Sequence, residues 1–214
     1  NTYKQFPEVM VKGEGNYLID ENGKRYLDFL SGIAVNPLGY GNKGIEEAIE
    51  KQSKSLIHAS NYFFTEAPLK LASLLVENTC FDKVFFSNSG AEANEGAIKL
   101  SRKYSQLKYG ADRNVIITFN NSFHGRTLAT LTATGQDSFH QNFFPLPEGF
   151  TYCPFNDYAT LESMIDDRVC AIMMEPIQGE GGVNVADPEF LKKVRALTKE
   201  KDILLIFDEV QTGI

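Results

Sequence analysis

Short apolar runs alternate with amphipathic stretches from about residue 83 onward. Four of the runs have the length of buried strands: 83–87, 114–118, 169–174 and 203–208. Between them, residues 91–109 and 188–201 place apolar side chains at helical spacing. Strands and helices that alternate in this way build a largely parallel sheet with helices on its faces. We therefore predict an α/β fold with a central, mostly parallel sheet and flanking helices.

The first part of the chain has a different pattern. Residues 13–20 and 25–30 are separated by a strong turn sequence, ENGK, and together they predict a β-hairpin. We expect a strand and helix segment over 1–60 and a larger, incomplete domain over 61–214.

Two amphipathic helices are expected after the hairpin. Ile45 and Ile49 share the apolar face of the first helix. Pro68 lies near the start of the second helix, on which Leu71, Leu74 and Leu75 are predicted to face inward.

The last residues resemble the interior of a domain. Residues 206–214 (IFDEVQTGI) continue a buried strand into a polar turn, whereas chain termini usually lie in exposed segments. We therefore expect the chain to be part of a longer protein, so that its large domain is incomplete.

The composition is that of a globular protein, with 43% hydrophobic and 23% charged residues. Lys and Arg number 21 and Asp and Glu number 28, a net charge of −7 that argues against a nucleic-acid partner. No apolar run approaches the roughly 20 residues that span a bilayer, so no membrane association is expected. Cys80, Cys153 and Cys170 are far apart and predict reduced, packed thiols in a cytoplasmic protein.

Residues 87–94 (SNSGAEAN) join a predicted strand to a predicted helix. Free N–H groups at a helix start favour a phosphate, and Gly90 and Ala91 leave the backbone accessible to a ligand. The alternative is an ordinary helix cap by Ser87 or Ser89.

Residues 122–127 (SFHGRT) follow the strand predicted at 114–118. Phe123 is suited to cover a planar ring, and Arg126 to clamp a carboxylate with two hydrogen bonds. A core Phe and a solvated Arg are the alternative. His124 has no metal-binding spacing around it, which favours a structural role.

Two further motifs follow predicted strands. Residues 175–182 (EPIQGEGG) carry two carboxylates, suited to acid/base chemistry, to neutralising a mobile Arg or to holding a loop. The alternative is a glycine-rich turn with a capping Glu. Residues 208–213 (DEVQTG) begin with Asp208 at the end of an apolar strand, so its carboxylate is expected to be buried and to need a partner. A protonated ring nitrogen is such a partner, and a local helix cap is the alternative.

The motifs together are more specific than any one of them. A phosphate site, a ring-stacking Phe and a buried Asp fit a phosphorylated aromatic cofactor, and pyridoxal 5'-phosphate (PLP) suits them. An NAD-dependent dehydrogenase has the same alternation of strands and helices, but the chain contains no GxGxxG motif after a strand.

On these motifs, together with YLDFLSGIAVN at 26–36, the chain resembles the class III PLP-dependent aminotransferases over essentially its whole length. Within them it is most similar to the acetylornithine aminotransferases. The resemblance implies fold type I, as in aspartate aminotransferase, and a homodimer. It also implies transfer of an amino group from N-acetylornithine to 2-oxoglutarate, with ornithine or another ω-amino acid as the alternative donor.

The resemblance also implies a role for each matching residue. Gly90 and Ala91, beside Ser89, would bind the cofactor phosphate through N–H groups. Phe123 and Val210 would lie on opposite faces of the cofactor ring. Asp208 would pair with the ring nitrogen and Gln211 with the ring hydroxyl. Arg126 would bind the substrate α-carboxylate, and Glu180 would pair with an arginine further along the family's sequence.

The chain departs from the family pattern in two ways. Tyr40 and Phe64 stand near the expected substrate entrance where relatives tend to have His and Tyr, which leaves the exact donor open. The lysine that carries the cofactor in this family follows the DEVQTG motif, beyond residue 214. The 214 residues alone are therefore expected to be inactive, as a fragment of the enzyme.

Overall fold

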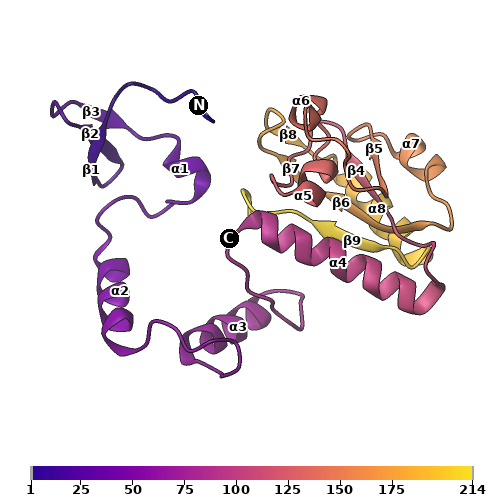
Figure 1. The fold of residues 1–214 in the computed structure, drawn as a ribbon, viewed down its shortest axis with the longest axis horizontal. Helices are drawn as coiled ribbons and strands as arrows, with labels where there is room; N and C mark the ends of the chain where they lie inside the picture. The colour runs from indigo at the N-terminus through magenta and orange to yellow at the C-terminus, as the bar shows by residue number, and fades with distance from the viewer. Residues whose placement is uncertain (1, 214) are drawn as a thin grey trace. The chain divides into compact units, whose positions relative to one another are not determined.

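The computed structural model describes residues 2–213 and divides into two compact units. One unit ends at Phe85 and the other begins at Phe86. Figure 1 labels the helices and strands of both units. The boundary predicted between residues 60 and 61 lies inside the first unit and stays a prediction.

The first unit contains a small antiparallel sheet and three helices. Its elements are β1 (Met10–Glu14), β2 (Tyr17–Asp20), β3 (Arg25–Leu27), α1 (Ser31–Ala34), α2 (Lys43–Ser55) and α3 (Glu66–Asn78). The predicted hairpin is confirmed as β2 and β3, with Leu18 opposite Tyr26. Asp20 closes its turn, because Oδ1 accepts hydrogen bonds from the N–H groups of Asn22 and Lys24, both at 2.9 Å.

The two predicted helices are confirmed as α2 and α3, but the predicted inward position is wrong for Leu71 and Leu74 of α3. These two side chains are 47% and 58% exposed, whereas Leu75 is half-buried. An amphipathic helix buries its apolar stripe only against a partner surface, and the described residues cover this stripe only in part.

The second unit is built on a parallel sheet of four strands. Its strands are β4 (Val115–Phe119), β5 (Phe150–Cys153), β6 (Val169–Met174) and β9 (Leu204–Phe207), in the order β5-β4-β6-β9. Three of the four predicted strands, all but 83–87, are therefore confirmed as β4, β6 and β9. All six residues of β6 are buried, as expected for a central strand covered on both faces.

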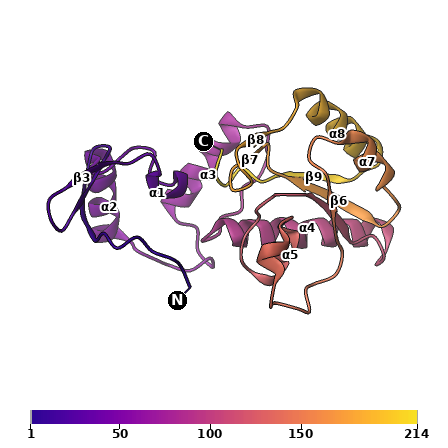
Figure 2. The ribbon, with the colours of Figure 1, turned by 90° about the horizontal axis from the view of Figure 1, so that it is seen from above.

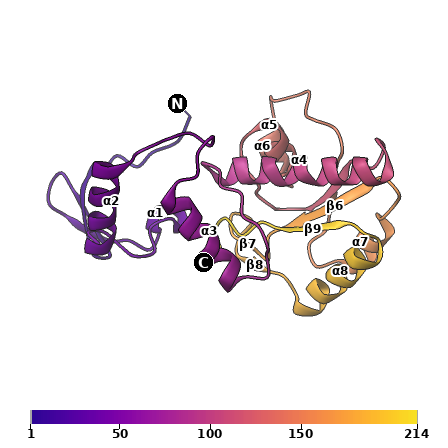
Figure 3. The ribbon, with the colours of Figure 1, turned by 90° about the horizontal axis from the view of Figure 1, so that it is seen from below.

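Helices cover both faces of this sheet. Figures 2 and 3 show α4 (Gly90–Tyr109) and α5 (Leu128–Ala133) on one face, with α7 (Tyr158–Ser163) and α8 (Pro188–Glu200) on the other. Neighbouring residues of β4 point to opposite faces: Ile116 packs with Ile98 of α4, and Ile117 with Val194 of α8. The predicted helices at 91–109 and 188–201 are thereby confirmed.

The remaining elements of the second unit are short. They are α6 (Asp137–His140) and the two strands of an antiparallel hairpin, β7 (Ile177–Gln178) and β8 (Asn184–Val185). None of the helices that the structure describes is long and apolar enough to span a membrane.

The predicted strand at 83–87 is wrong. This segment has no strand partner among residues 2–213, and Phe85 is 81% exposed. An apolar run of this length becomes a strand only where a neighbouring strand accepts its backbone hydrogen bonds.

Candidate active site

The candidate site lies where three adjacent strands end. The loop carrying Phe123 follows β4, Glu175 directly follows β6, and Asp208 directly follows β9. Since β4, β6 and β9 are neighbours in a parallel sheet, their carboxyl ends share one edge. The N-terminus of α4 reaches the same place, because Asn94 of this helix contacts Asp208.

Asp208 is surrounded by hydrogen-bond donors. It is only 7% exposed, which confirms the predicted burial. Oδ2 lies 2.7 Å from both His124 Nδ1 and Asn94 Nδ2, and Oδ1 accepts the Val210 N–H at 3.1 Å. Donors placed around a carboxylate stabilise its negative charge. The carboxylate therefore has three partners within the protein. The alternative interpretation from the sequence, a local helix cap, accounts only for the contact with the Val210 N–H.

His124 and Asn94 hold one another as well as Asp208. Asn94 Nδ2 also donates to the His124 carbonyl at 2.8 Å, so both amide hydrogens are used. The His124 N–H donates to Thr134 Oγ1 at 2.9 Å. His124 Nε2 is buried and has no hydrogen-bond partner among the residues that the structure describes.

Sequence reasoning gave neither residue a role at the site. It treated His124 as structural and quoted Asn94 only within its motif. One signal was available for Asn94: a polar amide one turn into an amphipathic helix, close to the predicted buried face.

The start of α4 has the helix cap that was predicted as one alternative. It also leaves backbone N–H groups available to an anion. Ser89 is the N-cap, and its Oγ accepts the Glu92 N–H at 3.2 Å. The N–H groups of Gly90 and Ala91 have no acceptor within the helix, as at every helix start. A Cβ on Gly90 would lie 2.6 Å from Val210 Cγ1, so only glycine lets Val210 approach the helix this closely.

Phe123 is fixed through its backbone. Its N–H donates to Glu175 Oε2 at 2.9 Å, and its half-buried ring meets the Phe139 ring edge-on at 5.6 Å between centroids. Arg126 is exposed, and its guanidinium carbon lies 5.9 Å from the Phe123 ring centre. The two predicted side chains are thus brought together.

Gln211 is brought against the glycine-rich motif. A Cβ on Gly179 would lie 1.6 Å from Gln211 Oε1, so this contact requires glycine. Glu180, the next residue, is exposed. The structure thus brings Val210 against Gly90 and Gln211 against Gly179. Among residues 2–213, Glu180 forms no hydrogen bond or ion pair with the other predicted site residues.

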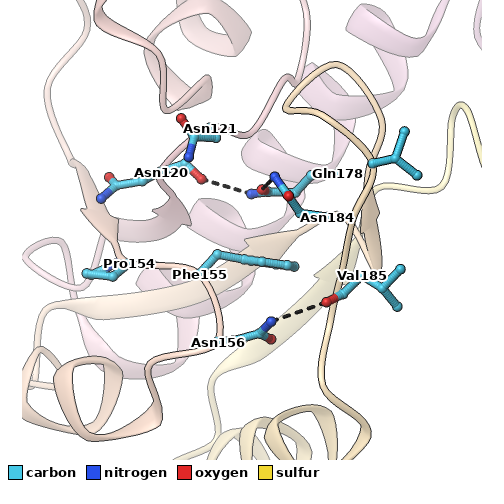
Figure 4. A pocket seen from close by; sticks show the side chains of 9 residues that line it. Asn120, Asn121, Pro154, Phe155, Asn156, Gln178, Asn184 and Val185 are labelled. Carbon is cyan, nitrogen blue, oxygen red and sulfur yellow. Dashed lines mark hydrogen bonds between the residues drawn. The ribbon is translucent and has the colours of Figure 1, made fainter.

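A separate pocket opens beside the β7–β8 hairpin (Figure 4). Gln178 Nε2 donates to the Asn120 carbonyl at 2.9 Å, and Asn156 Nδ2 donates to the Val185 carbonyl at 3.2 Å. The lining is rich in neutral amides and includes none of the residues predicted to bind cofactor or substrate. It consists of Asn120, Asn121, Pro154, Phe155, Asn156, Gln178, Val183, Asn184 and Val185.

Comparison with known families identifies the group to which this site belongs. The family described as aminotransferase class-III matches residues 1–214. The chain belongs to this family. Its members use PLP. No group of three or more His, Cys, Asp or Glu side chains suited to a metal occurs among residues 2–213.

Individual class-III relatives are similar over the whole chain. The acetylornithine aminotransferase of Caldanaerobacter subterraneus subsp. tengcongensis is 56% identical over 214 residues, which is 100% of this chain and 54% of that protein. The chain therefore spans about half the length of the curated relatives it matches.

Solved structures show the same fold. The ornithine aminotransferase of Toxoplasma gondii matches with a TM-score of 0.94 at 34% identity, over 100% of this chain and 51% of that one. The N-acetylornithine aminotransferase of Stenotrophomonas maltophilia matches with a TM-score of 0.83 at 41% identity, over 99% and 53%. The chain thus has the fold of the PLP-dependent aminotransferases, as predicted.

Proposed function

We propose that these residues belong to a PLP-dependent aminotransferase that converts N-acetylornithine and 2-oxoglutarate into N-acetylglutamate semialdehyde and glutamate, a step of arginine biosynthesis. The proposal concerns a longer protein. In it, this chain is joined to a segment that corresponds to the half of the relatives' length that the chain does not span. The observation that carries it is the buried Asp208 carboxylate, held beside the start of α4 and three donors. The 56% identity to an acetylornithine aminotransferase supports the choice of substrate.

The residues present fit PLP at both of its ends. For the phosphate, Gly90 and Ala91 offer N–H groups at a helix start, next to the Ser89 cap. For the ring nitrogen, Asp208 offers a buried carboxylate whose Oδ1 receives only the Val210 N–H in the described contacts. Val210 touches Gly90, so the residue proposed for one ring face adjoins the residue proposed for the phosphate.

The other cofactor contacts follow from the same arrangement. We propose that Phe123 covers the ring face opposite Val210, and that Gln211, seated on Gly179, hydrogen-bonds the ring hydroxyl. PLP, when bound, supplies a protonated ring that withdraws electrons from the substrate carbon. The part of Asp208 is to keep a positive charge on the ring nitrogen, and the part of His124 and Asn94 is to hold that carboxylate in place.

Substrate binding is proposed for two exposed charges. Arg126, beside the Phe123 ring, is suited to bind the α-carboxylate of the amino donor with two parallel hydrogen bonds. Glu180 is proposed to pair with an arginine outside this chain during the 2-oxoglutarate half-reaction. We further propose a cytoplasmic homodimer, with no nucleic-acid or membrane partner.

A direct assay tests the substrate. The protein extended to the relatives' length should form glutamate from 2-oxoglutarate with the highest kcat/KM for N-acetylornithine. A tenfold preference for free ornithine or 4-aminobutyrate, about 1.4 kcal/mol of discrimination, would contradict the proposal. The ornithine alternative has its own support in the TM-score of 0.94 to an ornithine aminotransferase.

The cofactor is tested separately by spectroscopy. The extended protein should bind PLP, and the absorption spectrum of PLP should shift. The shift is expected because a lysine outside these 214 residues attaches the cofactor covalently. Because that lysine is expected outside the 214 residues, we propose that the 214 residues alone show no turnover in the same assays.

A further inference from the structure

Glu175 is a buried acid that the proposed chemistry does not use. It follows the last residue of β6, and Asp208 follows the last residue of β9. Met174 and Phe207 are partners in the parallel register, so the two acids occupy the next positions on neighbouring strands. Glu175 is 7% exposed, and a carboxyl group this deeply buried needs hydrogen-bond donors.

The loop after β4 supplies a hydrogen-bond donor to Glu175, and the loop after β6 contributes a second backbone amide nearby. The Phe123 N–H donates to Oε2 at 2.9 Å, and the Gly179 amide is among the groups that lower the pKa of the same carboxyl group. Burial and the nearby Asp208 charge raise the pKa of Glu175, while these two amides and His124 lower it, and the net pKa is raised. The Glu175 carboxyl group thus lies where the loop carrying Phe123 and the loop carrying Gly179 meet the ends of β6 and β9.

Each loop leads directly to a side chain with a proposed cofactor contact. Phe123 itself carries the ring proposed to stack, and Gly179 lies in contact with the amide oxygen of Gln211. We propose that Glu175 is a positioning residue, which fixes the loop of Phe123 and the loop under Gln211 at one distance from each other. The expected effect on PLP binding rests on the proposed function. The expected effect on the two loops does not.

Water is a poor substitute for this carboxyl group. The site is almost closed to solvent, and a buried N–H without an acceptor costs the full desolvation of that group. Leu in place of Glu175 removes both acceptor oxygens at similar volume. Gln keeps one acceptor oxygen and replaces the other with a donor, so it preserves only part of the accepting capacity of the carboxyl group.

The first test uses the cofactor-free protein. Hydrogen exchange of the Phe123 amide, followed by NMR, should be about tenfold faster or more in Glu175→Leu, and exchange of the Gly179 amide should also rise. In Glu175→Gln the increases should be smaller, because one acceptor oxygen remains. Glu148→Gln, at an exposed glutamate of the same unit, is the matched control and should change neither. Unchanged exchange of both amides in Glu175→Leu, or in Glu175→Gln if the Leu variant does not fold, overturns the proposal.

The second test measures PLP affinity in the extended protein. Glu175→Leu and Phe123→Leu should each weaken binding about tenfold, and the double variant should be weakened by clearly less than the product of the two effects, because Glu175 acts in part through Phe123. A double variant weakened by the product of the two effects would mean that Glu175 does not act through Phe123. If the wild-type protein does not bind PLP, the proposed function fails, and the exchange measurement still decides whether Glu175 fixes the loops.

Discussion

His124 Nδ1 lies 2.7 Å from Asp208 Oδ2, and the two side chains are only 0% and 4% exposed. The contact joins the loop after β4 to the end of β9, although β6 lies between these strands in the sheet. Because a carboxylate only accepts hydrogen bonds, His124 donates through Nδ1. Asp208 is therefore held in place by hydrogen bonds from other residues of the protein, and its position does not depend on a ligand.

Removing the charge of Asp208 separates its chemical role from its structural one. Asp208→Asn keeps the shape of the side chain, and one oxygen remains to accept from His124 and Asn94. We expect turnover of the extended protein to fall by a hundredfold or more, in the range of other lost electrostatic contacts in active sites, roughly 10²–10³. Circular dichroism should show an unchanged fold. A rate near that of the wild type would leave Asp208 with a structural role only, through its contacts with His124, Asn94 and the Val210 N–H.

Asn94 should contribute to stability as well as to the site. Asn94→Ala leaves the buried His124 carbonyl without its donor and takes one donor from Asp208. A lost partner of a buried polar group costs about 1–3 kcal/mol of unfolding free energy. Urea unfolding measures this directly. Gln106→Ala, at an exposed amide of the same helix, is the control and should stay within about 0.5 kcal/mol of wild type; equal effects of the two substitutions would contradict the role of Asn94.

The fold was predictable where the apolar pattern was long or strong. β6 is a run of six apolar residues and α4 a helix of 20 residues, and both were found with nearly correct ends. β5 was missed because its sequence, FTYC, mixes exposed and buried positions over only four residues. The strand predicted at 83–87 failed because an apolar run does not show whether a partner strand lies beside it.

The site was predictable only in part, for a related reason. Burial of Asp208 followed from its place at the end of an apolar strand. Its partners did not follow, because His124 is 84 residues away and Asn94 is 114 residues away along the chain. Periodicity reports on near neighbours, whereas these contacts depend on strand order. The raised pKa of Glu175 depends in the same way on burial that only the folded sheet produces.

The contact between Gly90 and Val210 predicts a conditional effect on cofactor binding. A Cβ at residue 90 would lie 2.6 Å from one methyl of Val210 and 2.9 Å from the other, closer than carbon atoms approach. Gly90→Ala should therefore weaken PLP binding of the extended protein about tenfold, on the scale of the 1–3 kcal/mol that overpacking costs. In a Val210→Ala background the same substitution should have little effect. A Gly90→Ala effect of equal size in both backgrounds would mean that Val210 is not the cause.

Arg126 should not be replaceable by lysine. A guanidinium forms two parallel hydrogen bonds to a carboxylate, and an ammonium group lacks that geometry. In the extended protein, Arg126→Lys should raise KM for the amino donor and lower kcat/KM about tenfold, the size of one lost charged hydrogen bond. Arg168→Lys, at an exposed arginine paired with Asp166, should leave both constants unchanged. An unchanged kcat/KM in Arg126→Lys would leave Arg126 without a part in substrate binding.

Asp202 predicts a stability effect confined to a defined pH range. Its carboxylate accepts hydrogen bonds from Lys108 Nζ at 2.7 Å, from Tyr104 OH at 3.3 Å and from Tyr109 OH. These contacts, with that of Lys108 the largest, lower the pKa of Asp202 from 3.8 to about 2. They join the C-terminal end of α4 to the turn before β9.

A carboxyl group whose pKa is lower in the folded than in the unfolded protein stabilises the folded state above the unfolded pKa. That contribution is lost as the pH falls through the folded pKa. The stability difference between wild type and Asp202→Asn should therefore be constant near neutral pH and should shrink between pH 3.8 and about 2. Urea unfolding at a series of pH values measures it, with Asp112→Asn, at an exposed aspartate, as the control. A difference that persists undiminished at pH 2 would show that the contacts of Asp202 do not depend on its charge, and that the hydrogen bonds from the two tyrosines alone hold the end of α4.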